Sequence, residues 1–112
     1  MTHTRKRETP YNARRRVAAE AQRKVNFRQF IEEEGGLQGQ SSFFFTASKT
    51  HSSPWVLYMV KSDRDVPYPN FKSYVREGWI KSVRRWKTPN GALMDTYEVT
   101  DAGWAVIESV EA

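Results

Sequence analysis

The chain has 112 residues, carries a formal net charge of +5 at pH 7 and contains no cysteine. This length suits one domain with an appendage, and the lack of cysteine excludes a disulfide framework or a thiolate metal site. The two histidines, His3 and His51, are distant in sequence, so we expect no metal and no cofactor. No apolar run approaches a membrane span and no signal-peptide core follows the basic start, so we expect a cytoplasmic protein without a membrane partner.

Basic residues are concentrated in two blocks of the chain. Residues 1–28 hold nine Lys or Arg and two acids, and residues 61–87 hold eight Lys or Arg and three acids. Residues 88–112, by contrast, hold five acids and no base. Two basic blocks on a mixed chain favour a polyanionic partner, most simply nucleic acid, although charge that serves solubility alone is the alternative explanation.

Residues 1–34 are expected to form a basic N-terminal arm and helix. Thr9 suits a helix cap and Pro10 the first turn, so a helix is predicted over residues 11–34, closed by Gly35-Gly36. Arg14, Arg15 and Arg16 crowd the positive end of the helix dipole, and Glu32, Glu33 and Glu34 crowd the negative end.

Each misplaced charge costs about 0.3–1 kcal/mol when it is exposed, so this helix should gain from a partner. Phosphates that neutralise the arginines would be one such partner, and a second copy of the chain, pairing through this helix as a homodimer, would be another. A third interpretation is a frayed basic extension of which only residues 27–31 pack on the domain.

Residues 35–42 have the composition of a linker, and residues 43–112 are expected to form the main domain. The run Phe43-Phe44-Phe45 cannot face one side of a strand, which indicates an element buried on both faces or a packed helix. Ser52-Ser53-Pro54 is typical of a helix start, so we favour a helix over residues 55–61. The alternative is a hairpin of residues 43–46 with residues 56–60, because Trp, Val, Leu and Tyr also favour strands.

Residues 62–69 are rich in turn formers, and Pro69-Asn70 opens the next predicted helix. Its apolar face would hold Phe71, Tyr74 and Val75, and Gly78 would end it. Its other face carries Lys72, Ser73 and Arg76. Taken alone, this is an ordinary amphipathic helix with a solvated face.

A basic hairpin should follow, with strands over residues 79–86 and 93–99 and a turn at Thr88-Pro89-Asn90-Gly91. Alternation along the first strand groups Ile80, Ser82, Arg84 and Trp86 on one side and Trp79, Lys81, Val83 and Arg85 on the other. On the second strand, Leu93, Tyr97 and Val99 should point inward. The hairpin carries four cations: Lys81, Arg84, Arg85 and Lys87. We leave Trp86 out of the predicted site, because such a residue more often packs at the root of a hairpin than stacks on a base.

The last element is a helix that Thr100 should cap, with Asp101 favourable at its start. Trp104, Ile107 and Val110 would bury against the sheet.

The order of helix, basic hairpin and closing helix resembles the C-terminal half of MarR-like and PadR-like winged-helix regulators and of small phage regulators. The resemblance depends on Glu77-Gly78-Trp79-Ile80 and on the pattern Tyr97-x-x-Thr100-x-x-Gly103. It covers about a third of the chain. It implies a winged helix-turn-helix in which residues 70–77 form the recognition helix. With the basic N-terminal helix predicted from residues 1–34, the expected fold class is α+β, a winged helix-turn-helix with a long basic N-terminal helix.

The leading functional hypothesis is a small winged-helix protein that binds double-stranded DNA and regulates transcription, of phage or mobile-element type. Bases would be read by the 70–77 helix and phosphates contacted by the arm and the hairpin. The predicted site is Lys72, Ser73, Arg76, Lys81, Arg84, Arg85, Lys87, Arg14, Arg15 and Arg16. The alternative is a protein-interaction module, such as a host-protein inhibitor or assembly factor, whose sticky surface is Phe43, Phe44, Phe45 and Trp55. RNA binding is a third hypothesis. We do not expect an enzyme, because no nucleophile–base pair, glycine-rich phosphate loop or metal cluster is evident.

Overall fold

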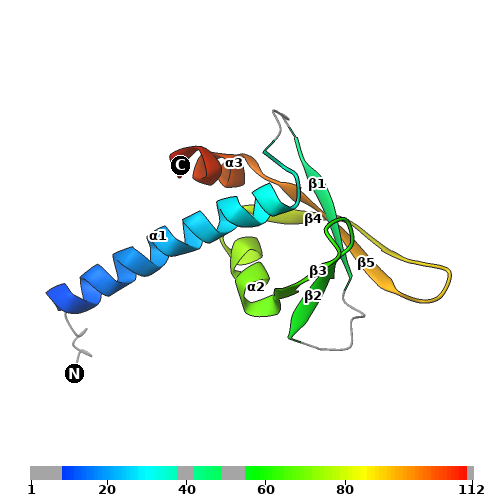
Figure 1. Ribbon diagram of the computed structural model, residues 1–112, viewed down its shortest axis with the longest axis horizontal. Helices are drawn as coiled ribbons and strands as arrows, with labels where there is room; N and C mark the ends of the chain where they lie inside the picture. Colours follow the sequence, from blue (N-terminus) through cyan, green and yellow to red (C-terminus); the bar gives the residue numbers. More distant parts are fainter. Residues whose placement is uncertain (1–8, 38–41, 49–54, 111–112) are drawn as a thin grey trace, which may run out of the picture.

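The computed structural model describes residues 9–37, 42–48 and 55–110, which form an α+β fold of three helices and one antiparallel sheet (Figure 1). The strand order is β3-β2-β1-β5-β4. In chain order the elements are α1 (Pro10–Glu33), β1 (Phe44–Ser48), β2 (Val56–Met59), β3 (Arg64–Pro67), α2 (Tyr68–Arg76), β4 (Ile80–Lys87), β5 (Leu93–Val99) and α3 (Asp101–Ser109). The predicted α+β class is confirmed. Predictions for residues 1–8 and 38–41, both histidines and the helix start at Ser52-Ser53-Pro54 lie outside the described residues.

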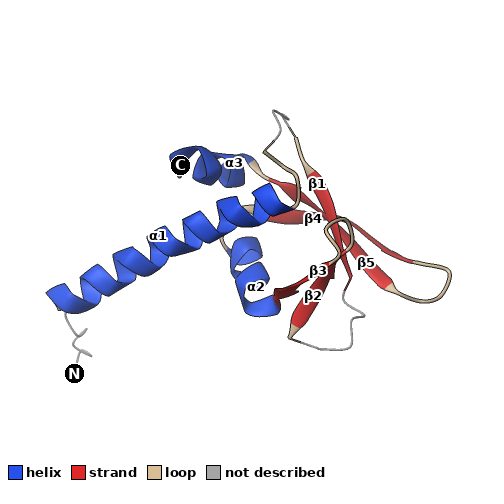
Figure 2. Ribbon diagram, in the orientation of Figure 1, coloured by secondary structure: helices blue, strands red, loops and turns tan. Residues whose placement is uncertain are grey.

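All three helices lie on one side of the sheet, and the core fills the space between them (Figure 2). Aromatic rings dominate this core. Phe27 of α1 lies 5.0 Å from Tyr74 and 5.2 Å from Trp79, and Phe71 of α2 lies 4.8 Å from Tyr97, all between ring centroids. Edge-to-face and tilted ring pairs of this kind each add to the free energy gained from burial.

The long helix α1 is anchored at one end only. Thr9 accepts a hydrogen bond from the Asn12 amide at 3.1 Å, which confirms the predicted cap, and Gly35 follows the helix with φ +88°. Its buried residues, Phe27, Phe30 and Ile31, all belong to the C-terminal end. The N-terminal half projects away from the body in Figure 1, and the radius of gyration of 16.9 Å exceeds the roughly 13 Å of a compact domain of about this length.

The favoured helix over residues 55–61 is wrong, because this segment is strand β2. It pairs antiparallel with β1, where Ala47 faces Met59, and with β3, where Leu57 faces Val66. Leu57 and Met59 are buried while their neighbours are less so, which is the two-residue period of a strand. The alternative is thus right that this segment is a strand paired antiparallel with β1, but the pairing uses residues 47–48 rather than 43–46. The predicted turn over residues 62–69 is also shorter than expected, since β3 and the start of α2 occupy most of it.

The three consecutive phenylalanines alternate across a strand that is buried on one face, not on both. Phe43 and Phe45 point into the core and are 4% and 3% exposed, whereas Phe44 is 51% exposed on the other face. The prediction of an element buried on both faces is therefore wrong.

The hairpin of β4 and β5 has the predicted turn, but its first strand does not alternate regularly. The turn is closed by a hydrogen bond of 2.9 Å from the Thr88 amide to the Ala92 carbonyl, and Gly91 has φ +88°. A bulge between Ser82 and Arg84 shifts the register of β4. A bulge places two residues opposite one and reverses the parity beyond it. The predicted grouping of Arg84 and Trp86 with Ile80 is therefore wrong.

Helices α2 and α3 are close to their predicted bounds. Phe71 and Tyr74 are buried as expected, but Val75 is 40% exposed, so its predicted burial is wrong. In α3, Thr100 accepts a hydrogen bond from the Gly103 amide at 3.1 Å, which confirms the predicted cap. The buried residues of α3 are Gly103, Val106 and Ile107, whereas Trp104 and Val110 are half-buried.

Candidate nucleic-acid interface

Helix α2 presents a cationic face to solvent. Lys72, Val75 and Arg76 are exposed, while Phe71 and Tyr74 fix the opposite side of the helix in the core. Lys72 and Arg76 are four residues apart and thus neighbours on the helix surface. Neither makes an ion pair with another described residue. Two long cations on a rigidly mounted helix are free to meet an anionic or hydrogen-bonding surface.

Ser73, the third predicted residue of α2, belongs to a different surface. It is half-buried, and its hydroxyl donates a hydrogen bond of 2.7 Å to the Asn70 carbonyl. It lies in a shallow groove between the two helices, which is lined by Ala19, Gln22, Arg23, Asn26, Asn70, Ser73 and Tyr74. The structure therefore separates Ser73 from Lys72 and Arg76.

The predicted arginines of the arm lie on the projecting part of α1, and all three are exposed. Positions 15, 19, 22 and 26 share one helical stripe, so Arg15 lies on the α2 side of α1, one turn before the groove. Arg15 also lies over the Tyr11 ring at 5.7 Å, and Arg16 is 3.5 Å from Glu20. These exposed contacts are weak, so both arginines can exchange them for phosphates.

The four cations of the hairpin are divided between the two faces of the sheet. On the face of the sheet that bears no helix, Lys81 lies 3.7 Å from Glu98, and the guanidinium of Arg84 lies 5.4 Å over the Trp86 ring. On the helix side, Arg85 faces Asp95 and Lys87 faces Leu93. Strand alternation grouped Lys81 with Arg85 and opposed them to Arg84, whereas the bulge at Val83 groups Arg84 with Lys81 and leaves Arg85 on the helix side.

Arg85 belongs to a buried polar cluster that sequence reasoning missed. Its Nε is 2.9 Å from Asp95 Oδ1, and the Asp95 side chain is fully buried. The hydrogen bond to Asp95 raises the pKa of the Arg85 guanidinium. Burial, followed by the charge of Asp95, raises the pKa of Tyr97 to about 12. A signal existed, because Asp95 shares the inward parity of Tyr97 and Val99 and lies across the predicted hairpin from Arg85.

A second buried ion pair fixes the end of α1 to the β2–β3 hairpin. Glu34 is 1% exposed, and its Oε2 accepts hydrogen bonds from Ser62 Oγ at 2.6 Å and Arg64 Nε at 3.1 Å. Arg64 also lies 3.1 Å from Glu33. This contact holds the C-terminal end of α1 at a defined angle to the sheet. Because α1 is one continuous helix, the contact also fixes where the arm arginines, residues 14–16, lie.

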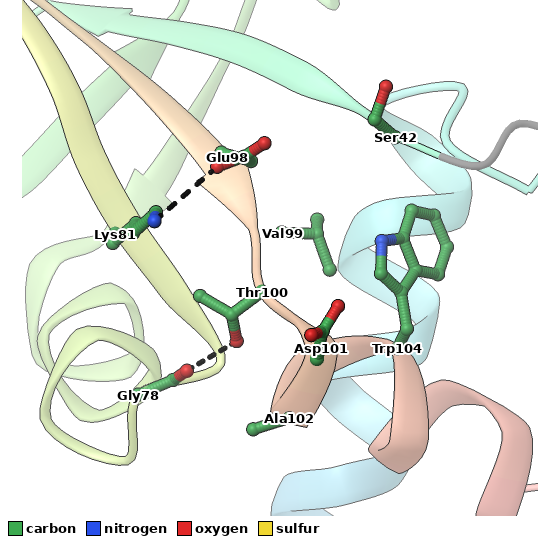
Figure 3. A pocket seen from close by; sticks show the side chains of 9 residues that line it. All are labelled: Ser42, Gly78, Lys81, Glu98, Val99, Thr100, Asp101, Ala102 and Trp104. Carbon is green, nitrogen blue, oxygen red and sulfur yellow. Dashed lines mark hydrogen bonds and ion pairs between the residues drawn. The ribbon is translucent and has the colours of Figure 1, made fainter.

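An open hollow lies at the root of the hairpin, beside the start of α3 (Figure 3). The ion pair of Lys81 and Glu98 forms one wall, and the Trp104 ring lies across from it. The Thr100 hydroxyl bonds to the Gly78 carbonyl and also caps α3. These contacts join the segment that follows α2 to the start of α3.

The arm and the hairpin tip point away from each other along the longest dimension of the molecule, which is 57 Å (Figure 1). No described helix is both long and apolar enough to cross a membrane, and the described residues contain no cluster of three or more potential metal ligands. Comparisons of the chain with protein-family models, curated proteins and solved structures find no match, so the binding properties of these surfaces are argued from their own side chains.

Proposed function

We propose that this protein binds double-stranded DNA through the exposed face of α2 and acts as a small transcriptional regulator. The observation that carries the proposal is the placement of Lys72 and Arg76 on one solvent face of a helix whose other face is fixed by Phe71 and Tyr74. An α-helix fits the major groove of DNA, and a long cationic side chain can reach guanine there with two hydrogen bonds. The phage or mobile-element type of regulator is part of the same proposal.

The neighbouring arm supports this reading by supplying charge beside α2. Arg14, Arg15 and Arg16 continue α1 past the groove that it forms with α2. Their contacts with described residues are exposed and easily exchanged. Phosphate contacts from this arm would orient α2 on the duplex without reading sequence. They would also relieve the conflict of these arginines with the helix dipole.

The fold proposed for residues 68–110 is a winged-helix variant. The order α2-β4-β5-α3 gives a reading helix, a hairpin and a closing helix, and the preceding helix of a standard helix-turn-helix is replaced by the β2–β3 hairpin. Because Arg85 is engaged with Asp95, and Lys81 and Arg84 lie on the face of the sheet opposite α2, the phosphate contact of the hairpin would come from Lys87.

Selection of a preferred duplex from a random pool, followed by titration of variants, tests this function. Arg76→Ala should weaken binding to the preferred site by about 1–3 kcal/mol and binding to random duplex by much less, because a base contact carries sequence information. Lys61→Ala is the control, since Lys61 is an exposed lysine beside Gly35 at the far end of α1. An unenriched pool, or an Arg76→Ala variant that binds like wild type, would refute the proposal.

The second candidate is a protein-interaction module, favoured by an apolar strip on the projecting part of α1. The strip is formed by Ala13, Val17, Ala18 and Ala21, and Val17 is 58% exposed. Exposed apolar surface on an otherwise charged helix is typical of a protein contact. A homodimer that pairs through α1 is one such protein contact. If it forms, Val17→Glu should lower the molar mass that light scattering measures.

A further inference from the structure

The face of the sheet that bears no helix carries its own ordered set of side chains. The strand register places them in three rows across β4, β5 and β1. The first row is Lys81, Glu98 and Phe44, the second is Arg84, Thr96 and Thr46, and the third is Trp86, Met94 and Ser48. We call these nine residues the open face. The bulge at Val83 creates it, since without the parity change Arg84 and Trp86 would point to the helix side.

Aromatic and cationic groups are neighbours on the open face. The Arg84 guanidinium lies 5.4 Å over the Trp86 ring, whose Nε1 is 3.5 Å from Thr96 Oγ1. The hydroxyls of Thr96 and Thr46 are 3.2 Å apart, which continues the polar row on to β1. Trp86 is half-buried and Phe44 is 51% exposed. The sheet thus offers two accessible rings, with hydroxyls between them and cations along the β4 edge.

On this side of the sheet, the β4 edge carries cations and the β2–β3 edge carries acidic groups. Lys81 and Arg84 lie at the β4 edge, whereas Tyr58 on β2 donates a hydrogen bond to Asp63, and Asp65 lies opposite Tyr58 on β3. An anionic ligand would therefore follow the strands β4, β5 and β1 and avoid the β2–β3 side. Phe44 and Trp86 are two strands apart and four paired positions apart along β5, which is about 16 Å from ordinary strand spacing and rise. They would therefore meet different bases.

We propose that the open face binds single-stranded nucleic acid, with bases stacked on Trp86 and Phe44 and phosphates directed to Lys81 and Arg84. Bases inside a duplex are stacked on one another, whereas unpaired bases expose π-faces that stack on aromatic side chains. An arginine beside the stacking ring adds a cation–π contribution and neutralises phosphate. The cations along β4 and the accessible rings favour a polyanion that carries aromatic groups over an apolar partner. The site is separate from α2, which lies on the other side of the sheet.

The test is fluorescence anisotropy of labelled single strands, oligo(dT) and oligo(U) of about 12 nucleotides, which is within the size range of known single-strand sites. Phe44→Ala and Trp86→Ala should each weaken binding about ten-fold or more, the loss expected for one stacked base. Trp86→Phe should retain most of the affinity because it keeps a ring. Trp55→Ala is the matched control, since Trp55 is 70% exposed but is not part of the open face.

Two further measurements make the result decisive. Affinity for the selected duplex should be unchanged in Phe44→Ala, while Arg76→Ala should spare single-strand binding, so failure of one site is distinguishable from failure of the other. Polyglutamate should compete poorly, because it has charge without bases. Wild-type single-strand binding by both Phe44→Ala and Arg84→Gln, no binding of single strands by the wild type, or equal competition by polyglutamate would each overturn the proposal. Phe44 is largely solvent-exposed, so its replacement should leave the fold intact even if Trp86→Ala unfolds.

Discussion

The Arg85 guanidinium covers the Asp95 carboxylate at 2.9 Å, joining an arginine that is 60% exposed to an acid that is fully buried. A surface cation of the hairpin is thus a structural residue, because it neutralises a carboxylate that has no access to water. Arg85, which the sequence analysis placed among the phosphate contacts of the hairpin, is engaged in this ion pair instead.

Arg85→Ala should lower the melting temperature, because it removes the cation that neutralises a buried carboxylate. Lys87→Ala on the same side of β4 should not, as Lys87 faces Leu93. A double-mutant cycle with Asp95→Asn, read by chemical denaturation, should show that the two losses are not additive. Additive losses would mean that the two side chains act independently.

Stability at high pH should depend on Tyr97. Its pKa of about 12 lies above the ordinary tyrosine value of 10.0, so the folded state holds the proton to a higher pH than the unfolded state does. The stabilising effect is complete below pH 10 and is lost as the pH rises through 12. Tyr97→Phe removes this titration. Its free energy of unfolding should therefore fall less steeply between pH 10 and 12 than that of the wild type, as urea denaturation at each pH will measure.

Truncation of an apolar side chain should lower the free energy of unfolding much more at the C-terminal end of α1 than at its N-terminal end. Phe27→Ala should cost about 3–5 kcal/mol of unfolding free energy, because Phe27 is fully buried against Tyr74 and Trp79. Val17→Ala should change it by less than about 0.5 kcal/mol, since Val17 is 58% exposed. A large loss for Val17→Ala in dilute protein would indicate that the projecting part of α1 is covered.

Gly103 should not tolerate a side chain. A Cβ atom there would lie 2.2 Å from the Trp79 carbonyl oxygen and 2.9 Å from Val99 Cγ1, so α3 would have to move away from the start of β4. Gly103→Ala should therefore destabilise the fold in thermal denaturation, although alanine is the better helix former. Ala105→Gly provides the comparison on an exposed position of the same helix, where only the propensity cost of about 1 kcal/mol applies.

The salt dependence of duplex binding tests the arm. Replacing Arg14, Arg15 and Arg16 together by Gln should lower the slope of log affinity against log salt by up to about 2.7 if all three contact phosphates. Preference for the selected sequence should be retained, since phosphate contacts carry no sequence information. An unchanged slope would place the DNA elsewhere on the molecule.

Sequence reasoning succeeded where local chemistry decides the structure. The Thr9 and Thr100 caps, the stop at Gly78 and the turn at Thr88–Gly91 each depend on a few neighbouring residues, and each was predicted. Strand β2 was not settled, because the apolar run from Trp55 to Val60 fits a buried helix as well as a strand, and only its pairing with β1 decides between them.

The candidate site was predicted in part. The exposure of Lys72 and Arg76 follows from helical periodicity, and both side chains are exposed in the structure. The hairpin cations were grouped wrongly on the two faces, because the bulge occurs at a valine and no glycine marks it. Phe44 was grouped with its neighbours as a sticky cluster, and its separation from Phe43 and Phe45 requires knowing which face the helices cover.

The central position of β1 in the sheet has a consequence for the order in which the protein can fold. β1 pairs on one side with β2, which follows shortly after it, and on the other with β5, where Ser48 faces Met94. The second pairing closes a loop of more than forty residues and carries the entropy cost of a non-local contact. A nascent chain therefore cannot complete its sheet until β5 has left the ribosome, and until then one edge of β1 remains open to association with other unfinished chains.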